Sequence, residues 1–363
     1  MELLSVQHGP SQALLSGVQL VKFAKYTVII SSYCIEGQGT AGRCLLDALL
    51  ECKAPLIKIL TNHNFLDAMQ TPEYMTLFSC SPNVQVRTWN HFFMNANHAK
   101  FIVVDNTFVS FGGYNFQEAY FMQPGEWSDL GLIVKSEEMA SHLTAYFKIM
   151  WEQAKRVPCS NRKLKNLKIC PAAKGTMLKL NKKVQSFQLL TQYPSRWFFH
   201  RHKSPAFDAI LRCMDSAHRS ISILSPDVID TCVWEVLTDK LEQGVHVKII
   251  TNQNYNPVQT FATVGERDVD FFRHRKHSFL EIRFSNPGKG TTYMNNWSWP
   301  HYADHSKYFD VDEQHFYIGS FNMDAMSLHA NGEIGIIVYD EPEVTSTIHS
   351  FVFQTSWDKA IMI

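Results

Sequence analysis

The chain has 363 residues and a formal net charge of zero, and 45% of its residues are hydrophobic and 13% aromatic. This composition excludes a disordered chain, and the zero net charge argues against a general polyanion-binding protein. The charge is uneven, however, because residues 153–207 contain thirteen Lys or Arg and no Asp or Glu. No apolar run approaches the roughly 18 residues that span a bilayer.

The N-terminus has no basic segment leading into a long apolar stretch, as a secretory signal would. We therefore expect a cytoplasmic protein or one at the membrane periphery, and export without a cleaved N-terminal signal stays open. Eight cysteines include no Cys-x-x-Cys pair. Their scatter favours free, buried thiols in a reducing compartment over a zinc site or a disulfide framework.

A strand–helix–strand pattern occurs twice along the chain. The first copy is predicted at Tyr26–Ser32, Arg43–Cys52 and Leu56–Leu60. The second copy is predicted at Ser220–Ser225, Cys232–Leu241 and Val247–Ile250. Strands that alternate with helices favour an α/β class with a parallel or mixed sheet.

Each copy is predicted to close with an amphipathic helix that carries a tryptophan, Trp151 or Trp357. We expect two tandem α/β units, residues 1–155 and 186–363, packed with pseudo-twofold symmetry around one shared active site. The basic segment 156–185 is predicted to be an exposed linker. Its charge fits a solvated connector as well as it fits contact with lipid headgroups or nucleic acid.

A histidine, a lysine and an aspartate recur at fixed spacing, followed by Gly-x-x-Asn. The two sets are His98, Lys100, Asp105 and Asn115, and His305, Lys307, Asp312 and Asn322. Residues i and i+2 of a strand share a face, so each histidine and its lysine are expected to point into one pocket. The aspartates have an odd offset from that face, which favours a structural role.

These residue types suit the cleavage of a phosphodiester. The two lysines would neutralise the non-bridging oxygens, and the amides of Asn115 and Asn322 would add hydrogen bonds. One neutral histidine would attack phosphorus, and the other, protonated, would give its proton to the leaving oxygen. We expect no cofactor and no metal ion, because the lysines compensate the charge and would repel a cation.

An imidazole in either role needs its second nitrogen held, normally by a carboxylate. Asp129 and Glu333 lie at matching places after the two histidines, in similar Asp-Leu-Gly-Leu-Ile-Val and Glu-Ile-Gly-Ile-Ile-Val segments. We therefore expect Asp129 to orient His98 and Glu333 to orient His305. Glu118 is a rival to Asp129 that lacks this sequence context.

The duplicated motif resembles the signature of the phospholipase D superfamily, and the resemblance extends over most of the chain. It implies a two-lobed α/β fold with one active site at the lobe interface and a ping-pong reaction through phosphohistidine. It also implies that His98 is the nucleophile and His305 the acid. The chain departs from the pattern at Gly113, where the family often has the serine found at Ser320.

The leading hypothesis is a monomeric phosphodiesterase of the phospholipase D type, which hydrolyses or transphosphatidylates glycerophospholipids at a membrane surface. Aromatic residues ahead of each motif suit that interface: Trp89, Phe92, Phe93, Trp297 and Trp299. The alternative is a metal-independent nuclease or nucleotidyl phosphodiesterase, favoured by the basic and aromatic stretches Arg196–Lys203 and Phe271–His277. A non-catalytic interaction protein on the same fold is disfavoured, because every motif position is intact.

Overall fold

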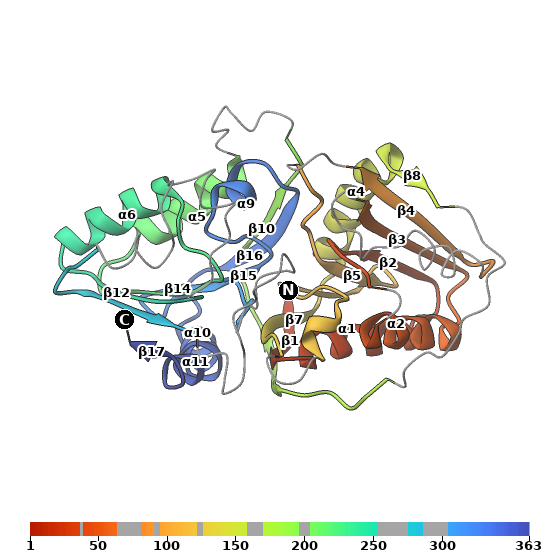
Figure 1. The fold of residues 1–363 in the computed structure, drawn as a ribbon, viewed down its shortest axis with the longest axis horizontal. Helices are drawn as coiled ribbons and strands as arrows, with labels where there is room; N and C mark the ends of the chain where they lie inside the picture. Colours follow the sequence, from red (N-terminus) through yellow and green to blue (C-terminus); the bar gives the residue numbers. More distant parts are fainter. Residues whose placement is uncertain are drawn as a thin grey trace, which may run out of the picture.

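Two mixed β-sheets form the framework of the protein, one from each copy of the repeat (Figure 1). The computed structural model describes residues 1–36, 39–63, 81–90, 95–121, 126–157, 170–195, 204–252, 275–285 and 304–362. All structural statements below refer to these residues.

The strands of the first sheet are β1 (Glu2–Gly9), β2 (Thr27–Ser31), β3 (Leu56–His63), β4 (Val84–Asn90), β5 (Phe101–Val104), β6 (Phe108–Gly112), β7 (Asp129–Lys135), β8 (Lys155–Arg156) and β9 (Thr176–Lys183). Their order across the sheet is β8-β4-β3-β2-β5-β6-β7-β1-β9. Strands β2, β3 and β4 run parallel, whereas β2 and β5 pair antiparallel.

The strands of the second sheet are β10 (Phe187–Gln192), β11 (Ser220–Leu224), β12 (His246–Thr251), β13 (Leu280–Phe284), β14 (Tyr308–Val311), β15 (His315–Gly319), β16 (Glu333–Val338) and β17 (Ile361–Met362). Their order is β10-β16-β15-β14-β11-β12-β13-β17. Read from its other end and without β9, the first sheet has the same order, with β1 in the place of β10 and β8 in the place of β17. The predicted α/β duplication is therefore confirmed.

The helical segments of the first unit are α1 (Gln12–Lys22), α2 (Thr40–Glu51), η1 (Glu118–Tyr120) and α4 (Glu137–Gln153). Those of the second are α5 (Pro205–Asp215), α6 (Thr231–Glu242), α9 (Ala325–His329), α10 (Pro342–His349), η2 (Ser350–Gln354) and α11 (Thr355–Trp357). Side-chain caps mark several starts: Asp230 accepts the backbone N–H groups of Cys232 and Val233 at the start of α6. None of the described helices is long and apolar enough to cross a membrane.

The tryptophan of each closing helix is held by an arginine and a lysine, which lie at matching positions of the two units. The Arg87 guanidinium lies 4.8 Å from the centre of the Trp151 ring, and that of Arg283 lies 4.1 Å from the Trp357 ring. Each arginine also donates a hydrogen bond to the carbonyl of its tryptophan. These stacked contacts fix the closing helices on their sheets.

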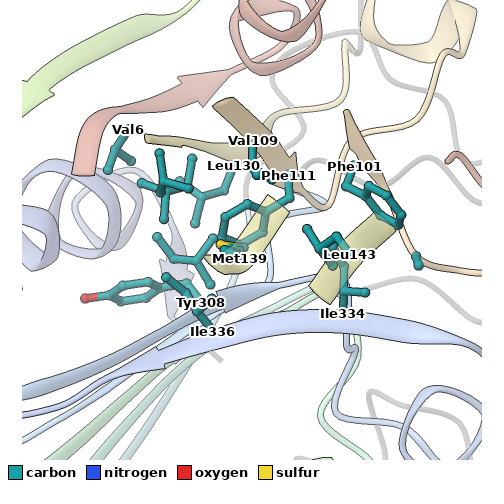
Figure 2. Packing of buried hydrophobic residues seen from close by; sticks show 14 of the residues in the cluster. Val6, Phe101, Val109, Phe111, Leu130, Met139, Leu143, Tyr308, Ile334 and Ile336 are labelled. Carbon is teal, nitrogen blue, oxygen red and sulfur yellow. The ribbon is translucent and has the colours of Figure 1, made fainter. Parts of the chain in front are cut away.

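One hydrophobic core is shared between the units (Figure 2). Phe101 and Phe111 of the first sheet and Leu143 of α4 meet Tyr308 and Ile336 of the second sheet in this cluster. Two further clusters lie within the first and the second unit. The two sheets thus pack as one body through the faces that carry these residues, which confirms the predicted pseudo-twofold packing.

The predicted linker does not run as a free connector along its whole length. Residues 176–183 form β9, which pairs antiparallel with β1 at the edge of the first sheet. Alternating residues Leu178 and Leu180 pack against the shared core, while Lys179 and Lys183 are exposed. Partly buried leucines alternate with exposed residues along this basic segment, which is the period of two that a strand with one buried face requires.

Trp89 is the one aromatic residue expected at a membrane interface that lies within the described residues. It belongs to β4, its Nε1 donates to Asn95 O at 3.0 Å, and its ring packs against the shared core. Phe92, Phe93, Trp297, Trp299, the stretch 196–203 and residues 271–274 of the second basic stretch lie outside the described residues.

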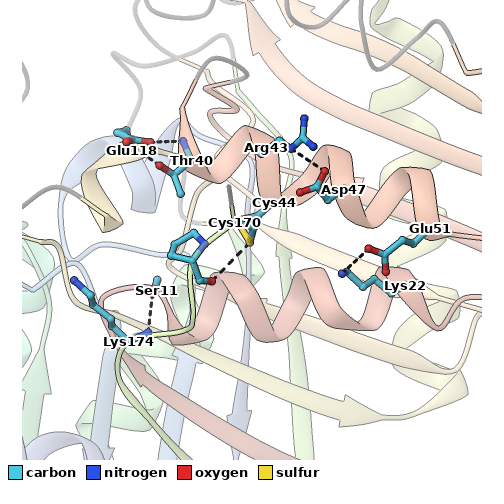
Figure 3. The surroundings of a disulfide bond; sticks show 11 residues. Ser11, Lys22, Thr40, Arg43, Cys44, Asp47, Glu51, Glu118, Cys170 and Lys174 are labelled. Atoms are coloured by element: carbon cyan, nitrogen blue, oxygen red, sulfur yellow. Dashed lines mark hydrogen bonds and ion pairs between the residues drawn. A yellow bond between two sulfur atoms is a disulfide. The ribbon is translucent and has the colours of Figure 1, made fainter. Parts of the chain in front are cut away.

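Cys44 and Cys170 form a disulfide, so the expectation of free thiols throughout is wrong (Figure 3). Cys44 lies on α2, and the Cys170 segment is fixed to the start of α1 by hydrogen bonds between Ser11 and Lys174. Cys34, Cys52, Cys213 and Cys232 are buried. The two bonded cysteines are distant in sequence and share no spacing pattern, so only the folded chain reveals the pair.

Replacing Cys170 with serine is expected to lower the free energy of unfolding by about 3–5 kcal/mol, because the bond closes a very long loop of the unfolded chain. The measurement is urea unfolding of wild type and variant, each with and without a reductant. The reductant should shift the wild-type midpoint to that of the variant and leave the variant unchanged. Coinciding midpoints in the untreated proteins would contradict the disulfide.

Candidate active site

Each motif histidine lies three residues before the first residue of a strand, β5 or β14, and so outside the strands in which we expected them. Their backbone N–H groups donate to the opposite unit: His98 to Gly332 O at 2.7 Å and His305 to Ser128 O at 2.8 Å. Because these donors are used across the unit boundary, the ladders begin at Phe101 and Tyr308. Both imidazoles are almost fully buried, with 9% and 6% of their residue surface exposed.

Matching asparagines at the carboxyl ends of β3 and β12 hold the residue before each histidine. Asn62 Nδ2 donates to Asn97 O at 2.8 Å, and Asn252 Nδ2 donates to Asp304 O at 2.8 Å. The Thr-Asn ending shared by the two strands therefore serves to place the catalytic segments.

Each histidine contacts the carboxylate of the opposite unit. His98 Nδ1 lies 2.8 Å from Glu333 Oε1, and His305 Nδ1 lies 2.9 Å from Asp129 Oδ2. The predicted pairing within each unit is therefore wrong, although the four residues belong to one site.

Two isolated β-bridges explain the exchange of partners. Asn97 pairs with Gly332, so the residues that follow them, His98 and Glu333, come together. Ser128 pairs with Asp304 in the same way, which brings Asp129 to His305. Each carboxylate therefore belongs to one sheet and contacts the motif histidine of the other sheet.

Glu118 does not contact either motif histidine among its described hydrogen bonds. Its Oε1 accepts from the Thr40 hydroxyl at 3.0 Å, and its Oε2 accepts from the Thr40 backbone N–H at the start of α2 (Figure 3). In these contacts Glu118 caps the start of α2, whereas Asp129, the acid with the repeated sequence context, contacts His305.

The two lysines lie buried beside their histidines. Lys307 Nζ is 2.9 Å from His305 Nδ1, and Lys100 Nζ donates to His98 O at 2.6 Å. Burial lowers the pKa of Lys307 to about 8, against the opposing effect of Asp129 and Glu333. Burial likewise holds the pKa of Lys100 well below its ordinary value, with Glu333 again opposing. Both carboxylates therefore help to keep the ammonium groups charged.

The same burial favours neutral imidazoles. It lowers the pKa of His305 to about 3, with Lys307 acting in the same direction and Asp129 against it. It also holds the pKa of His98 well below its ordinary value, helped by Lys100 and Lys307. Since Lys307 affects both rings, the two motifs act on one electrostatic site. A neutral ring whose Nδ1–H faces a carboxylate leaves Nε2 free to attack.

Burial raises the pKa of Glu333 to about 7, although Lys100 and the Ser320 hydroxyl lower it. The residue is fully buried, and the Ser320 hydroxyl donates to its Oε2 at 2.5 Å. The partner of His98 therefore titrates close to neutral pH.

The motif asparagines are buried in both units. Asn115 Nδ2 donates to Gln117 Oε1 at 3.0 Å, which uses one of the two hydrogens of this amide group. The Oδ1 atoms of Asn115 and Asn322 have no hydrogen-bond partner among the described residues. Buried acceptors of this kind are suited to a substrate hydroxyl or to water, in addition to the expected amide donation to phosphate.

The motif aspartates hold turns and do not face the histidines. Asp105 accepts the backbone N–H groups of Lys25, Tyr26 and Thr27. Asp312 accepts those of His218, Arg219 and Ser220 in the same arrangement. These contacts tie each motif hairpin to the strand beside it.

Three aromatic residues that the sequence reasoning missed surround the histidines. The Trp127 ring stacks on His305 at 5.3 Å between ring centres, and Tyr33 meets His98 edge to face at 5.3 Å. The Tyr120 hydroxyl donates to Asp129 Oδ2 at 2.8 Å. The available signal was the longer interval between motif asparagine and acid in the first unit, which contains Tyr120 and Trp127.

Gly113, the departure from the family pattern, lies against the other unit's motif. A Cβ at this position would overlap with Asp129 Oδ1 and lie 2.9 Å from His305 O and 3.0 Å from Lys307 Cδ. The position therefore has no room for the serine found at Ser320 in the second unit.

Replacing Gly113 with alanine is expected to lower both activity and stability, because the added methyl group displaces Asp129 from His305. Overpacking of this kind costs about 1–3 kcal/mol of unfolding free energy. Urea unfolding and kcat measured on the same preparations provide the test. Wild-type values for both would show that the site tolerates a side chain here.

Comparisons with known proteins agree with this architecture. The family model described as "cardiolipin synthase, PLD-like domain" matches residues 18–151 and 210–357. The chain is 26% identical over 269 residues to a cardiolipin synthase of Halalkalibacterium halodurans, covering 73% of this chain and 47% of the relative. It is 25% identical over 285 residues to a cardiolipin synthase of Alkalihalophilus pseudofirmus, covering 76% and 49%. The chain thus spans about half the length of these curated relatives.

Among solved structures, the fold is similar to that of phosphatidylserine synthase from Haemophilus influenzae. The TM-score is 0.70 at 14% sequence identity, and the alignment covers 100% of this chain and 89% of the other. At this identity the likeness concerns the fold alone.

Proposed function

Because the chain belongs to the phospholipase D superfamily, we propose that it hydrolyses or transphosphatidylates glycerophospholipids through a covalent phosphohistidine. The observation that carries the proposal is the pair of crossed histidine–carboxylate contacts beside two buried lysines. The two relatives named cardiolipin synthase support a phosphatidyl substrate.

In the first step, Nε2 of His98 attacks phosphorus and the bond from phosphorus to the leaving oxygen breaks. Glu333 holds Nδ1 of His98 and stabilises the positive charge that forms on the ring. Protonated His305 gives its proton to the leaving oxygen, so that an alcohol departs. Lys100 and Lys307 stabilise the charge on the non-bridging oxygens.

In the second step, water or an alcohol gives its proton to neutral His305 and attacks phosphorus. The bond between phosphorus and His98 breaks, and the resulting phosphatidic acid or phosphatidyl alcohol leaves.

The assignment of His305 as the acid has support in its surroundings. The stacked Trp127 ring and the Asp129 carboxylate both stabilise a protonated imidazole. Although the pKa of His305 is lowered to about 3 by burial in the free protein, a bound phosphodiester adds negative charge beside it. That charge favours uptake of the required proton.

The protein is proposed to work as a monomer at a membrane surface, with exposed Lys179 and Lys183 of β9 available to anionic headgroups. The Cys44–Cys170 disulfide suits an oxidising compartment better than the cytoplasm, which favours the export route that the sequence left open.

Mass spectrometry of products from a total lipid extract and from a nucleic-acid mixture tests the proposal. The expected result is phosphatidic acid in water and a phosphatidyl alcohol when a primary alcohol is added. Cleavage of oligonucleotides without release of any lipid headgroup would instead favour the nuclease alternative. Absence of turnover on both mixtures would favour the non-catalytic interaction protein.

A further inference from the structure

The carboxylates behind the two histidines receive hydroxyl donors from different residue types. In the second unit the Ser320 hydroxyl donates to Glu333 Oε2 at 2.5 Å and accepts from the backbone N–H of Ile334 at 3.0 Å. This hydroxyl therefore fixes the acid that orients His98.

In the first unit a tyrosine makes the corresponding contacts. The Tyr120 hydroxyl donates to Asp129 Oδ2 at 2.8 Å and accepts from the backbone N–H of Asn115 at 3.3 Å. Its oxygen also lies 3.5 Å from His305 Nδ1. The side chain is fully buried. Both hydroxyls thus accept one backbone N–H and donate to one carboxylate.

The exchange of serine for tyrosine follows from the position of the acid. Asp129 Oδ1 occupies the space that a side chain at Gly113 would need, and it accepts directly from the backbone N–H of Leu130 at 2.8 Å. In the second unit the matching N–H, that of Ile334, reaches Ser320 instead. A donor to Asp129 must therefore come from another direction, where Tyr120 lies.

We propose that Tyr120 is a positioning residue for His305, whose hydroxyl replaces the serine absent at Gly113 and holds Asp129 against the His305 ring. The catalytic consequence rests on the proposed function, whereas the positioning itself does not. With Asp129 held, His305 keeps its Nδ1–H directed at the carboxylate, and Nε2 faces the leaving oxygen.

The Tyr120 hydroxyl is suited to act as a constant donor. Burial and the adjacent Asp129 charge hold the pKa of Tyr120 well above its ordinary value, so the proton stays on the tyrosine. A residue with only a packing role would not need this hydroxyl, because the ring contact of Tyr120 with Trp127, at 5.8 Å between centres, is also available to phenylalanine.

The test compares Tyr120→Phe with Tyr114→Phe. Tyr114 is equally buried, and its hydroxyl contacts Ser110 Oγ at 2.6 Å, so the control also removes one buried hydroxyl. The first readout is the NMR signal of the His305 Nδ1 proton in protein labelled at histidine, identified by its absence in His305→Asn. We expect this signal to shift or broaden in Tyr120→Phe and to stay unchanged in Tyr114→Phe.

The second readout is kinetic and uses a phosphatidyl substrate. Tyr120→Phe is expected to lower kcat by about 10- to 100-fold, the usual effect of losing a hydrogen bond to a charged group, with little change in KM. The pH profile of its activity should also differ from that of wild type, because Asp129 that has lost this hydrogen bond is held less firmly beside His305 and stabilises the protonated ring less well.

The two hypotheses fail in different ways. If wild type turns over no phosphodiester, the proposed function fails, and the NMR comparison still decides the role of Tyr120. If Tyr120→Phe and Tyr114→Phe give the same Nδ1 signal as wild type, Tyr120 does not position the pair and the inference is overturned. Equal kinetic losses and equal pH profiles in the two variants would also overturn it.

Discussion

Replacing His305 with asparagine is expected to trap the enzyme after its first chemical step when the substrate has a good leaving group. A nitrophenyl phosphodiester needs no proton donor for departure of the nitrophenolate, so His98 can still attack. Resolution requires a base that takes the proton of water, and the variant lacks it. The covalent adduct on His98 should therefore accumulate and be visible in the intact mass.

His98→Asn should form no adduct with the same substrate, because the attacking nitrogen is missing. With a natural lipid, whose leaving alcohol needs a proton, both variants should lose activity. Removing a general acid or base costs about 10²–10⁴-fold in rate, and removing the nucleophile should cost at least as much. Steady-state release of headgroup measures this loss.

His349→Asn provides a matched control for these two variants. His349 Nδ1 lies 2.8 Å from Asp310 Oδ2, so it is another histidine–carboxylate pair of the second unit. It should keep near wild-type turnover. An adduct in His98→Asn and none in His305→Asn would reverse the roles of the two histidines, and adducts in neither would refute the covalent intermediate.

The repeated pattern was sufficient to predict the architecture, and the histidines, lysines and acids that it singled out lie together in the structure. Both sheets follow one strand order, because the same alternation of apolar segments and turns occurs twice in the sequence. The spacing of His98 to Asn115 and of His305 to Asn322 also identified one site, since chance rarely repeats so many chemically active residues at one interval.

The partners across the site could not be predicted in the same way. Periodicity tells which face of a strand a residue occupies, but not which unit lies opposite that face. Asp129 and Glu333 were therefore recognised as orienting acids and given the wrong histidines. Tyr120 and Trp127 fall in an interval that is longer than its counterpart in the second unit, so the repeat marked the interval but not the two residues within it.

Replacing Glu333 with glutamine is expected to reduce activity strongly while stabilising the fold above neutral pH. Glutamine can still accept from Ser320 and His98, but it cannot stabilise the positive charge on His98 during attack. The loss in kcat should be about 10²–10⁴-fold. With the nitrophenyl substrate the variant should resemble His98→Asn, whereas Asp129→Asn should resemble His305→Asn and accumulate the adduct.

The stability effect follows from the direction of the pKa shift. Burial raises the pKa of Glu333 from 4.5 to about 7, so the folded protein holds this proton more tightly than the unfolded chain does. The resulting stabilisation is complete below the unfolded value and is lost as pH rises through about 7. Glutamine carries no charge, so its stability does not fall in this way. The unfolding free energy of the variant should therefore rise relative to that of wild type by up to about 3 kcal/mol across this range. Urea unfolding at pH 4.5 and pH 8 measures the gain. If the difference in unfolding free energy between the variant and wild type does not grow with pH, folding does not raise the pKa of Glu333.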